Sequence, residues 1–147
     1  IAFDKAGNFS GNLLLCFFII IWCSDVGAFA FGITLGKFFP KKLFPTVSPK
    51  KTWIGFIGGL VSSVLAAFAL YEFHILKFPL IHCLILSLIM SVTGVYGDLY
   101  ESQWKRVYGV KDSGKIIPGH GGFLDRFDST LMAMPFGAIY LAIFDLL

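Results

Sequence analysis

The sequence predicts an all-α fold, a polytopic bundle of about four transmembrane helices with one long polar connection. Of the 147 residues, 56% are hydrophobic and only 14% are charged. A soluble domain carries about a quarter charged residues, so this composition indicates a protein surrounded by lipid. The mean hydropathy of +0.79 and the 17 phenylalanines support the same conclusion.

Four apolar runs supply the helices. A helix needs about 20 mostly apolar residues to cross a bilayer, and residues 11–35, 53–71, 79–95 and 130–147 meet or approach that length. The runs lack the polar and apolar alternation of membrane β-strands. We expect residues 1–147 to form a single integral-membrane domain. Because position 1 is Ile rather than Met, we also expect an N-terminal truncation, with earlier spans missing.

The charges between the runs predict an orientation. The first connection holds five lysines and no acid between positions 37 and 51, and the third connection holds five basic residues. The short second connection holds a single lysine, Lys77. Since basic connections tend to stay inside the cell, the first and third connections are predicted to be cytoplasmic.

Small residues recur at four-residue spacing along the second run, at Gly55, Gly59, Ser63 and Ala67. Such a stripe lets another helix approach closely. We favour packing within the chain over a dimer contact, and the stripe permits a homodimer without requiring one.

The third connection is too long and too charged for a simple tether. Residues 96–128 contain five acids and five bases, whereas helix connections are mostly a few residues long. Aromatic and aliphatic residues interspersed among these charges argue against disorder. Asp98 and Ser102 share one face if the third helix continues, because residues four apart are neighbours on a helix. Asp125 and Asp128 share a face in the same way at the start of the fourth helix.

The Pro-Gly-His-Gly-Gly stretch at residues 118–122 predicts an anion site. Glycines allow a tight turn with exposed N–H groups, and a helix N-terminus that follows such a turn attracts phosphates. Carboxylates nearby would repel a phosphate unless a cation lay between them, and Mg²⁺ is such a cation. The alternative is that Asp125 and Asp128 stabilise the helix start and that His120 only forms hydrogen bonds within the turn.

Asp25 lies inside an apolar run, where an ionisable group is costly and usually faces a polar cavity. The alternative is a neutral, hydrogen-bonded acid within the bundle. Lys50 and Lys51 lie where they could reach phosphates, although basic residues at a membrane surface also act as orientation signals or contact anionic lipids.

The stretches 102–106 (Ser-Gln-Trp-Lys-Arg), 111–112 (Lys-Asp) and 118–128 together resemble the signature of the bacterial-type phosphatidate cytidylyltransferase (CDP-diacylglycerol synthase) family. Residues 25–29 and 48–59 also match the family. The chain departs from the pattern at Trp104, usually aliphatic or Phe, and at Ile54, often an acid. The resemblance covers most of the chain and places it in the C-terminal catalytic half of the family's proteins.

The resemblance implies the synthesis of CDP-diacylglycerol and pyrophosphate from CTP and phosphatidate, in phospholipid biosynthesis. The implied cofactor is Mg²⁺, and a second cation is allowed. The implied partners are CTP, phosphatidate and membrane lipids, with no nucleic acid. The implied location is the cell (inner) membrane, with several spans and an active site that faces the cytoplasm.

The same resemblance, joined to the charge pattern, assigns the candidate site. Asp98 and Asp125 are the expected metal ligands. The expected catalytic residues are Asp98, Asp125, Asp128, Lys111 and His120. The expected substrate-binding residues are Asp25, Ser48, Lys50, Lys51, Ser102, Lys105, Arg106, Asp112, Gly121, Gly122 and Arg126.

Two rival functions stay open. A transporter or channel could use Asp25 as an intramembrane ion or proton site, but it would not explain the long charged connection. A CTP-dependent enzyme acting on an isoprenoid alcohol or an archaeal ether lipid is the nearer rival.

Overall fold

The computed structural model describes residues 11–39, 41–110 and 124–146, without the side chains of Lys50 and of residues 124–126. Its elements are α1 (Asn12–Thr34), β1 (Lys42–Phe44), β2 (Ser48–Thr52), α2 (Trp53–Glu72), α3 (Leu80–Val107) and α4 (Leu124–Ile143). Within these ranges, α1, α2 and α3 are long and apolar enough to cross a membrane, and α4 contains a shorter apolar helix, Phe127–Ile143. The predicted all-α membrane bundle is confirmed.

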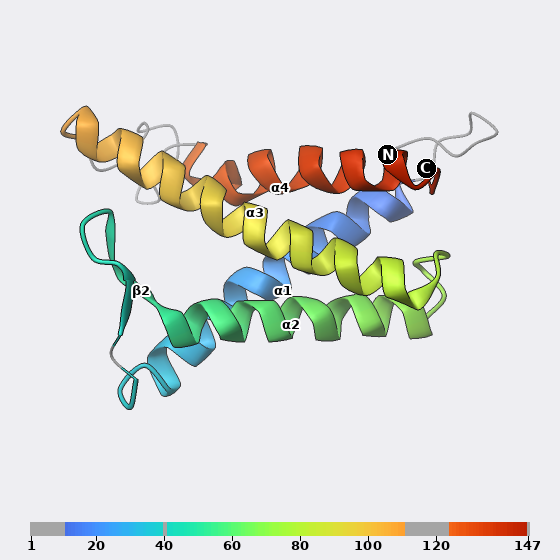
Figure 1. Cartoon of the computed structure of the whole chain (residues 1–147), viewed down its shortest axis with the longest axis horizontal. Helices are drawn as coiled ribbons and strands as arrows, with labels where there is room; N and C mark the ends of the chain where they lie inside the picture. The colour runs from blue at the N-terminus through green and yellow to red at the C-terminus, as the bar shows by residue number, and fades with distance from the viewer. Residues whose placement is uncertain (1–10, 40, 111–123, 147) are drawn as a thin grey trace.

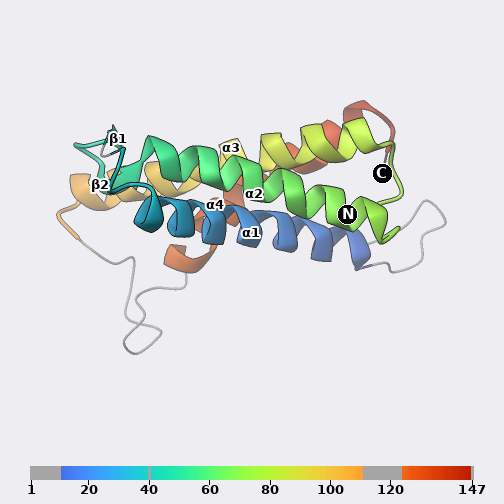
Figure 2. The same cartoon turned by 90° about the horizontal axis from the view of Figure 1, so that it is seen from below.

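The helices pack as two pairs, α1 along α2 and α3 along α4 (Figure 1). The β1–β2 hairpin, the C-terminal end of α3 and the start of α4 lie at one end of the bundle, which we call the hairpin end. The turn between α2 and α3 lies at the opposite end, and the view in Figure 2 agrees. The two basic connections therefore leave the same end of the bundle, as the sequence predicted.

The third helix is longer than its apolar run, whereas the predicted start of the fourth helix near Asp125 is confirmed. The helix α3 continues past the apolar run to Val107, and α4 begins at Leu124, so both ends of the polar stretch 102–128 are helical. Hydropathy marks only the part of a helix that lies in lipid. The polar turns of α3 are supported by Glu101 and Lys105, which pair one turn apart. Gly109, at φ +66°, follows the end of this helix in a conformation that favours glycine.

The first basic connection folds into a hairpin that the sequence did not predict. The strands β1 and β2 pair antiparallel, with Lys42 opposite Thr52 and Phe44 opposite Ser48. Thr52 also caps α2, because its Oγ1 accepts a hydrogen bond from the Gly55 N–H at 3.2 Å. The hairpin is thereby fixed to the first turn of α2, and Lys51 is fixed with it.

Bulky side chains fill the half of the bundle away from the hairpin end. Phe17 and Ile20 of α1 meet Leu86 and Met90 of α3 and Leu141 of α4, and all five are fully buried. In a bilayer such side chains stabilise the bundle by close van der Waals packing between helices rather than by leaving water. The hydrophobic core thus lies away from the charged connections.

Small residues bring α1 and α2 together toward the hairpin end. A Cβ atom on Gly55 would lie 2.8 Å from the Ala28 carbonyl oxygen, and one on Gly59 would lie 3.0 Å from the Ser24 carbonyl oxygen. Ser63 and Ala67 are buried in the same stripe. Packing within the chain, the favoured interpretation of the stripe, is confirmed, and the homodimer stays a prediction.

Candidate active site

The hairpin end contains a cavity of about 920 Å³ that is lined by all four helices and by the hairpin. This volume falls within the range of small-molecule sites, roughly 300–1,000 Å³. Part of the wall is apolar and comes mainly from α1. In the part of the chain that the structure describes, the charged part carries three acids and two lysines, namely Asp25, Asp98, Asp128, Lys51 and Lys105.

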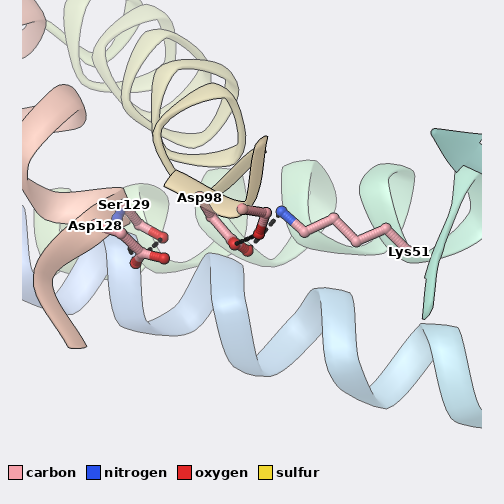
Figure 3. A network of polar contacts seen from close by, with 5 residues as sticks. Lys51, Asp98, Asp128 and Ser129 are labelled. Carbon is pink, nitrogen blue, oxygen red and sulfur yellow. Dashed lines mark hydrogen bonds and ion pairs between the residues drawn. The ribbon is translucent and has the colours of Figure 1, made fainter. Parts of the chain in front are cut away.

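Asp98 is the centre of the polar contacts in this cavity (Figure 3). Its Oδ2 lies 2.5 Å from the Lys51 ammonium nitrogen, and its Oδ1 accepts a hydrogen bond from the Ser102 hydroxyl at 3.3 Å. The predicted shared face of Asp98 and Ser102 is confirmed, because α3 continues as a helix through both. The ion pair with Lys51 joins the hairpin to α3.

Asp128 reaches the cavity from the start of α4. Its Oδ1 accepts a hydrogen bond of 2.6 Å from the Ser129 N–H. The α4 backbone comes close to α3 here, since a Cβ atom on Gly97 would lie 2.6 Å from the Asp128 carbonyl oxygen. Glycine at position 97 therefore brings Asp128 near the acids of α3, and Figure 3 shows it beside Asp98.

Asp25 lines the same cavity from α1. Its carboxyl group interacts electrostatically with Asp128, Asp98 and Lys51. This position agrees with the expectation that an acid within an apolar run faces a polar cavity. The rival role of Asp25 as an intramembrane ion or proton site stays a prediction.

The carboxylates of the cavity can hold a cation. Among the described residues, the charged lining consists of three acids and two lysines. Carboxylate oxygens are the ligands that Mg²⁺ prefers in proteins, so the donor chemistry fits the expected cofactor. Among the residues with described positions, no three His, Cys, Asp or Glu side chains are grouped as a metal site. The metal pair Asp98 and Asp125 stays a prediction, since the Asp125 side chain lies outside the described part.

The structure brings together six of the residues predicted from sequence. Five line the cavity, and Ser102 contacts one of them, Asp98. Ser48 begins β2 and Arg106 is exposed near the end of α3, and neither lines the cavity. For each of the remaining predicted residues, either the whole residue or its side chain lies outside the described part of the structure. These residues are Lys50, Lys111, Asp112, His120, Gly121, Gly122, Asp125 and Arg126.

Sequence reasoning missed several residues at the site. Glu101 contacts Lys105, and helical spacing could have found it because it lies on the same face of α3. Thr52 and Ser129 also line the cavity. The apolar wall includes Trp22 and Phe29, and no signal separates these residues from the other apolar residues of a membrane helix.

Comparison with known proteins identifies the family of the chain. A sequence model of the Cytidylyltransferase family matches residues 3–144. The phosphatidate cytidylyltransferase of Bacillus subtilis (strain 168) is 49% identical over 126 residues, which cover 86% of this chain and 46% of that protein. The phosphatidate cytidylyltransferase of Staphylococcus aureus (strain COL) is 47% identical over 124 residues, which cover 84% of this chain and 46% of that protein.

The phosphatidate cytidylyltransferase of Staphylococcus saprophyticus subsp. saprophyticus is 45% identical over 124 residues, with the same coverage of 84% and 46%. The chain spans about half the length of the curated relatives it matches. The family match extends over almost the whole chain. The chain belongs to the cytidylyltransferase family.

Proposed function

We propose that the protein transfers CMP from CTP to phosphatidate and releases CDP-diacylglycerol and pyrophosphate. The observation that supports this most is the charged cavity at the hairpin end, where Asp98 is paired with Lys51 and lies near Asp128. The relatives named above are phosphatidate cytidylyltransferases.

The two-sided wall of the cavity suits one ionic and one amphiphilic substrate. Lys51 and Lys105 offer positive charge to phosphate groups. The α1 side offers Trp22 and Phe29, which are 73% and 70% exposed along the helix surface. A lipid phosphate could thus reach the charged residues while its acyl chains stay beside α1 in the bilayer.

The reaction needs positioning and charge neutralisation more than acid–base chemistry. A phosphate oxygen of phosphatidate attacks the α-phosphorus of CTP and forms a new P–O bond. The bond from the α-phosphorus to the oxygen that bridges to the β-phosphorus breaks, and pyrophosphate leaves. Because the attacking phosphate is already ionised at neutral pH, no general base is required. Holding two anionic groups in line is then the main task of the protein.

The lysines and carboxylates divide this task. Lys51 and Lys105 bind substrate phosphates, and the basic residues and glycine amides between α3 and α4 contribute as the family resemblance implies. Asp98 and Asp125 would hold Mg²⁺, with Asp128 close by and a second cation allowed. Such a cation supplies charge neutralisation for the phosphates. The ion pair with Lys51 supports Asp98 as a cation-binding carboxylate.

We also propose that the protein lies in the cell membrane with the hairpin end in the cytoplasm. The lysine-rich hairpin and the basic end of α3 share that end, as expected of inside-facing connections. CTP is a cytoplasmic nucleotide, so this orientation places the cavity where CTP is available.

A lipid-choice assay tests the proposed function. The full protein, reconstituted in vesicles, receives CTP labelled at both the α- and the γ-phosphate together with phosphatidate, a polyprenol or an archaeal-type ether lipid. We expect label in the product formed from phosphatidate. Label only in the polyprenol or ether-lipid product would indicate the nearer rival, and label in no lipid would contradict a cytidylyltransferase and favour a transporter.

A further inference from the structure

Glu101 lies behind the charged wall of the cavity rather than on it. It comes from α3, one turn before Lys105 and nearly one turn after Asp98. Its side chain is 10% exposed, and both of its carboxyl oxygens are buried. The residues that line the cavity do not include it. Substrate in the cavity would therefore contact its neighbours and not Glu101 itself.

The Glu101 carboxyl group contacts two residues that do line the cavity. Its Oε1 lies 3.6 Å from the Lys105 ammonium nitrogen, and its carboxyl group lies near that of Asp128 of α4. A buried carboxylate is costly unless it is paired. The cost of burying Glu101 is thus offset by Lys105, which belongs to the site.

Each of the two lysines that line the cavity pairs with a carboxylate of α3. Lys51 pairs with Asp98, and Lys105 pairs with Glu101. These two carboxylates lie three residues apart on the helix. A lysine has a flexible four-carbon stem and a compact charge. An ion pair of this kind restricts the positions that the ammonium group occupies before substrate arrives.

We propose that Glu101 is a positioning residue that holds the Lys105 ammonium group at the cavity wall, ready for a substrate phosphate. This inference rests on the proposed function, because it assigns Lys105 the role of binding a phosphate of CTP or phosphatidate. Without Glu101, Lys105 keeps its charge but loses its fixed position. Part of the free energy of phosphate binding is then used to order the Lys105 side chain, so the phosphate binds more weakly.

A purely structural role for Glu101 is the alternative, in which the residue only stabilises the contact between α3 and α4. Such a role would lower stability or turnover regardless of what stands at position 105. A positioning role predicts instead that replacing Glu101 has no further effect on KM in a protein in which Lys105 has already been replaced.

A double-mutant cycle in the full protein separates the two. We expect Glu101→Gln to raise the KM for CTP or for phosphatidate by roughly tenfold, as neighbours in one ion-pair network are strongly coupled, with a smaller change in kcat. Lys105→Met should raise the same KM, and the double variant should be no worse than Lys105→Met alone. Glu101→Asp, which keeps the charge on a shorter stem, should fall between wild type and Glu101→Gln.

Multiplicative effects in the double variant, or a fall in kcat with both KM values unchanged, would overturn the proposal. If Glu101→Gln does not fold, the cycle is run with Glu101→Asp, whose smaller rise in KM must also vanish in the Lys105→Met background. Glu72→Gln, an exposed acid at the end of α2, is the matched control and should leave both KM values unchanged.

Equilibrium binding of CTP to the same variants separates this inference from the proposed function. Wild-type protein that transfers no label contradicts the proposed function, and the cycle is then decided by the dissociation constants for CTP. Coupled losses of affinity support Glu101 as a positioning residue for Lys105. Independent losses, or no loss in Glu101→Gln, contradict it.

Discussion

Replacing Asp98 with Asn is expected to lower the turnover of CMP transfer by about 10²–10³-fold, the usual loss when one preorganised electrostatic group of an active site is removed. Asp98 pairs with Lys51 and accepts a hydrogen bond from Ser102 in the cavity. Asparagine has nearly the same shape but no charge, so it cannot hold either a cation or Lys51 as firmly. Asp125→Asn is expected to behave alike, because we propose Asp125 as the second metal ligand.

The measurement is the kcat with labelled CTP and phosphatidate, together with the amount of protein inserted in the membrane. Insertion should be unchanged, since Asp98 lies outside the hydrophobic core. Glu72→Gln, at the opposite end of the bundle, should keep wild-type turnover. Near-normal turnover in both Asp98→Asn and Asp125→Asn would contradict the metal-ligand assignment.

Removing divalent cations is expected to abolish transfer. Three carboxylates line the described part of the cavity, and both proposed substrates bring phosphate groups close to them. Mg²⁺ bound by one or two carboxylates and by substrate phosphates is the usual solution to this problem.

The test is turnover after thorough chelation, followed by titration with Mg²⁺. Wild-type activity should return with added Mg²⁺, whereas Asp98→Asn should need much more Mg²⁺ or fail to recover. Undiminished activity after chelation would count against a required cation.

The transmembrane arrangement was predictable because hydropathy and charge act over whole segments. The span of α2 was predicted almost to the residue, and the close spacing of Asp98 and Ser102 followed from helical geometry. The length of α3 was not predicted, since its last turns are polar and leave the membrane while the helix continues. The hairpin was missed because strands as short as Lys42–Phe44 show no clear alternation.

The residues that form the site were easier to predict than the contacts between their side chains. Charged residues stand out in a membrane protein, and the charge pattern together with the family resemblance grouped Asp25, Lys51, Asp98 and Asp128. The pairing of Lys51 with Asp98 could not be predicted, because it depends on where the hairpin places Lys51 relative to α3. In the sequence, the only signal for the pairing of Glu101 with Lys105 is their four-residue spacing, which places them on one face of a helix.

The most direct test of the cavity as the CTP site uses two adjacent positions of β1. Leu43 lines the cavity, whereas Phe44 does not and is exposed, as expected of successive residues in a strand. Leu43→Cys and Phe44→Cys are made in a protein whose native Cys16, Cys23 and Cys83 are replaced by Ala. The rate of reaction with a water-soluble maleimide is then measured with and without CTP and Mg²⁺.

With CTP at ten times its dissociation constant, occupancy should slow the labelling of Leu43→Cys by about tenfold and leave that of Phe44→Cys unchanged. Equal labelling rates with and without CTP at Leu43→Cys, in a protein that still binds CTP, would contradict the assignment of this cavity as the nucleotide site.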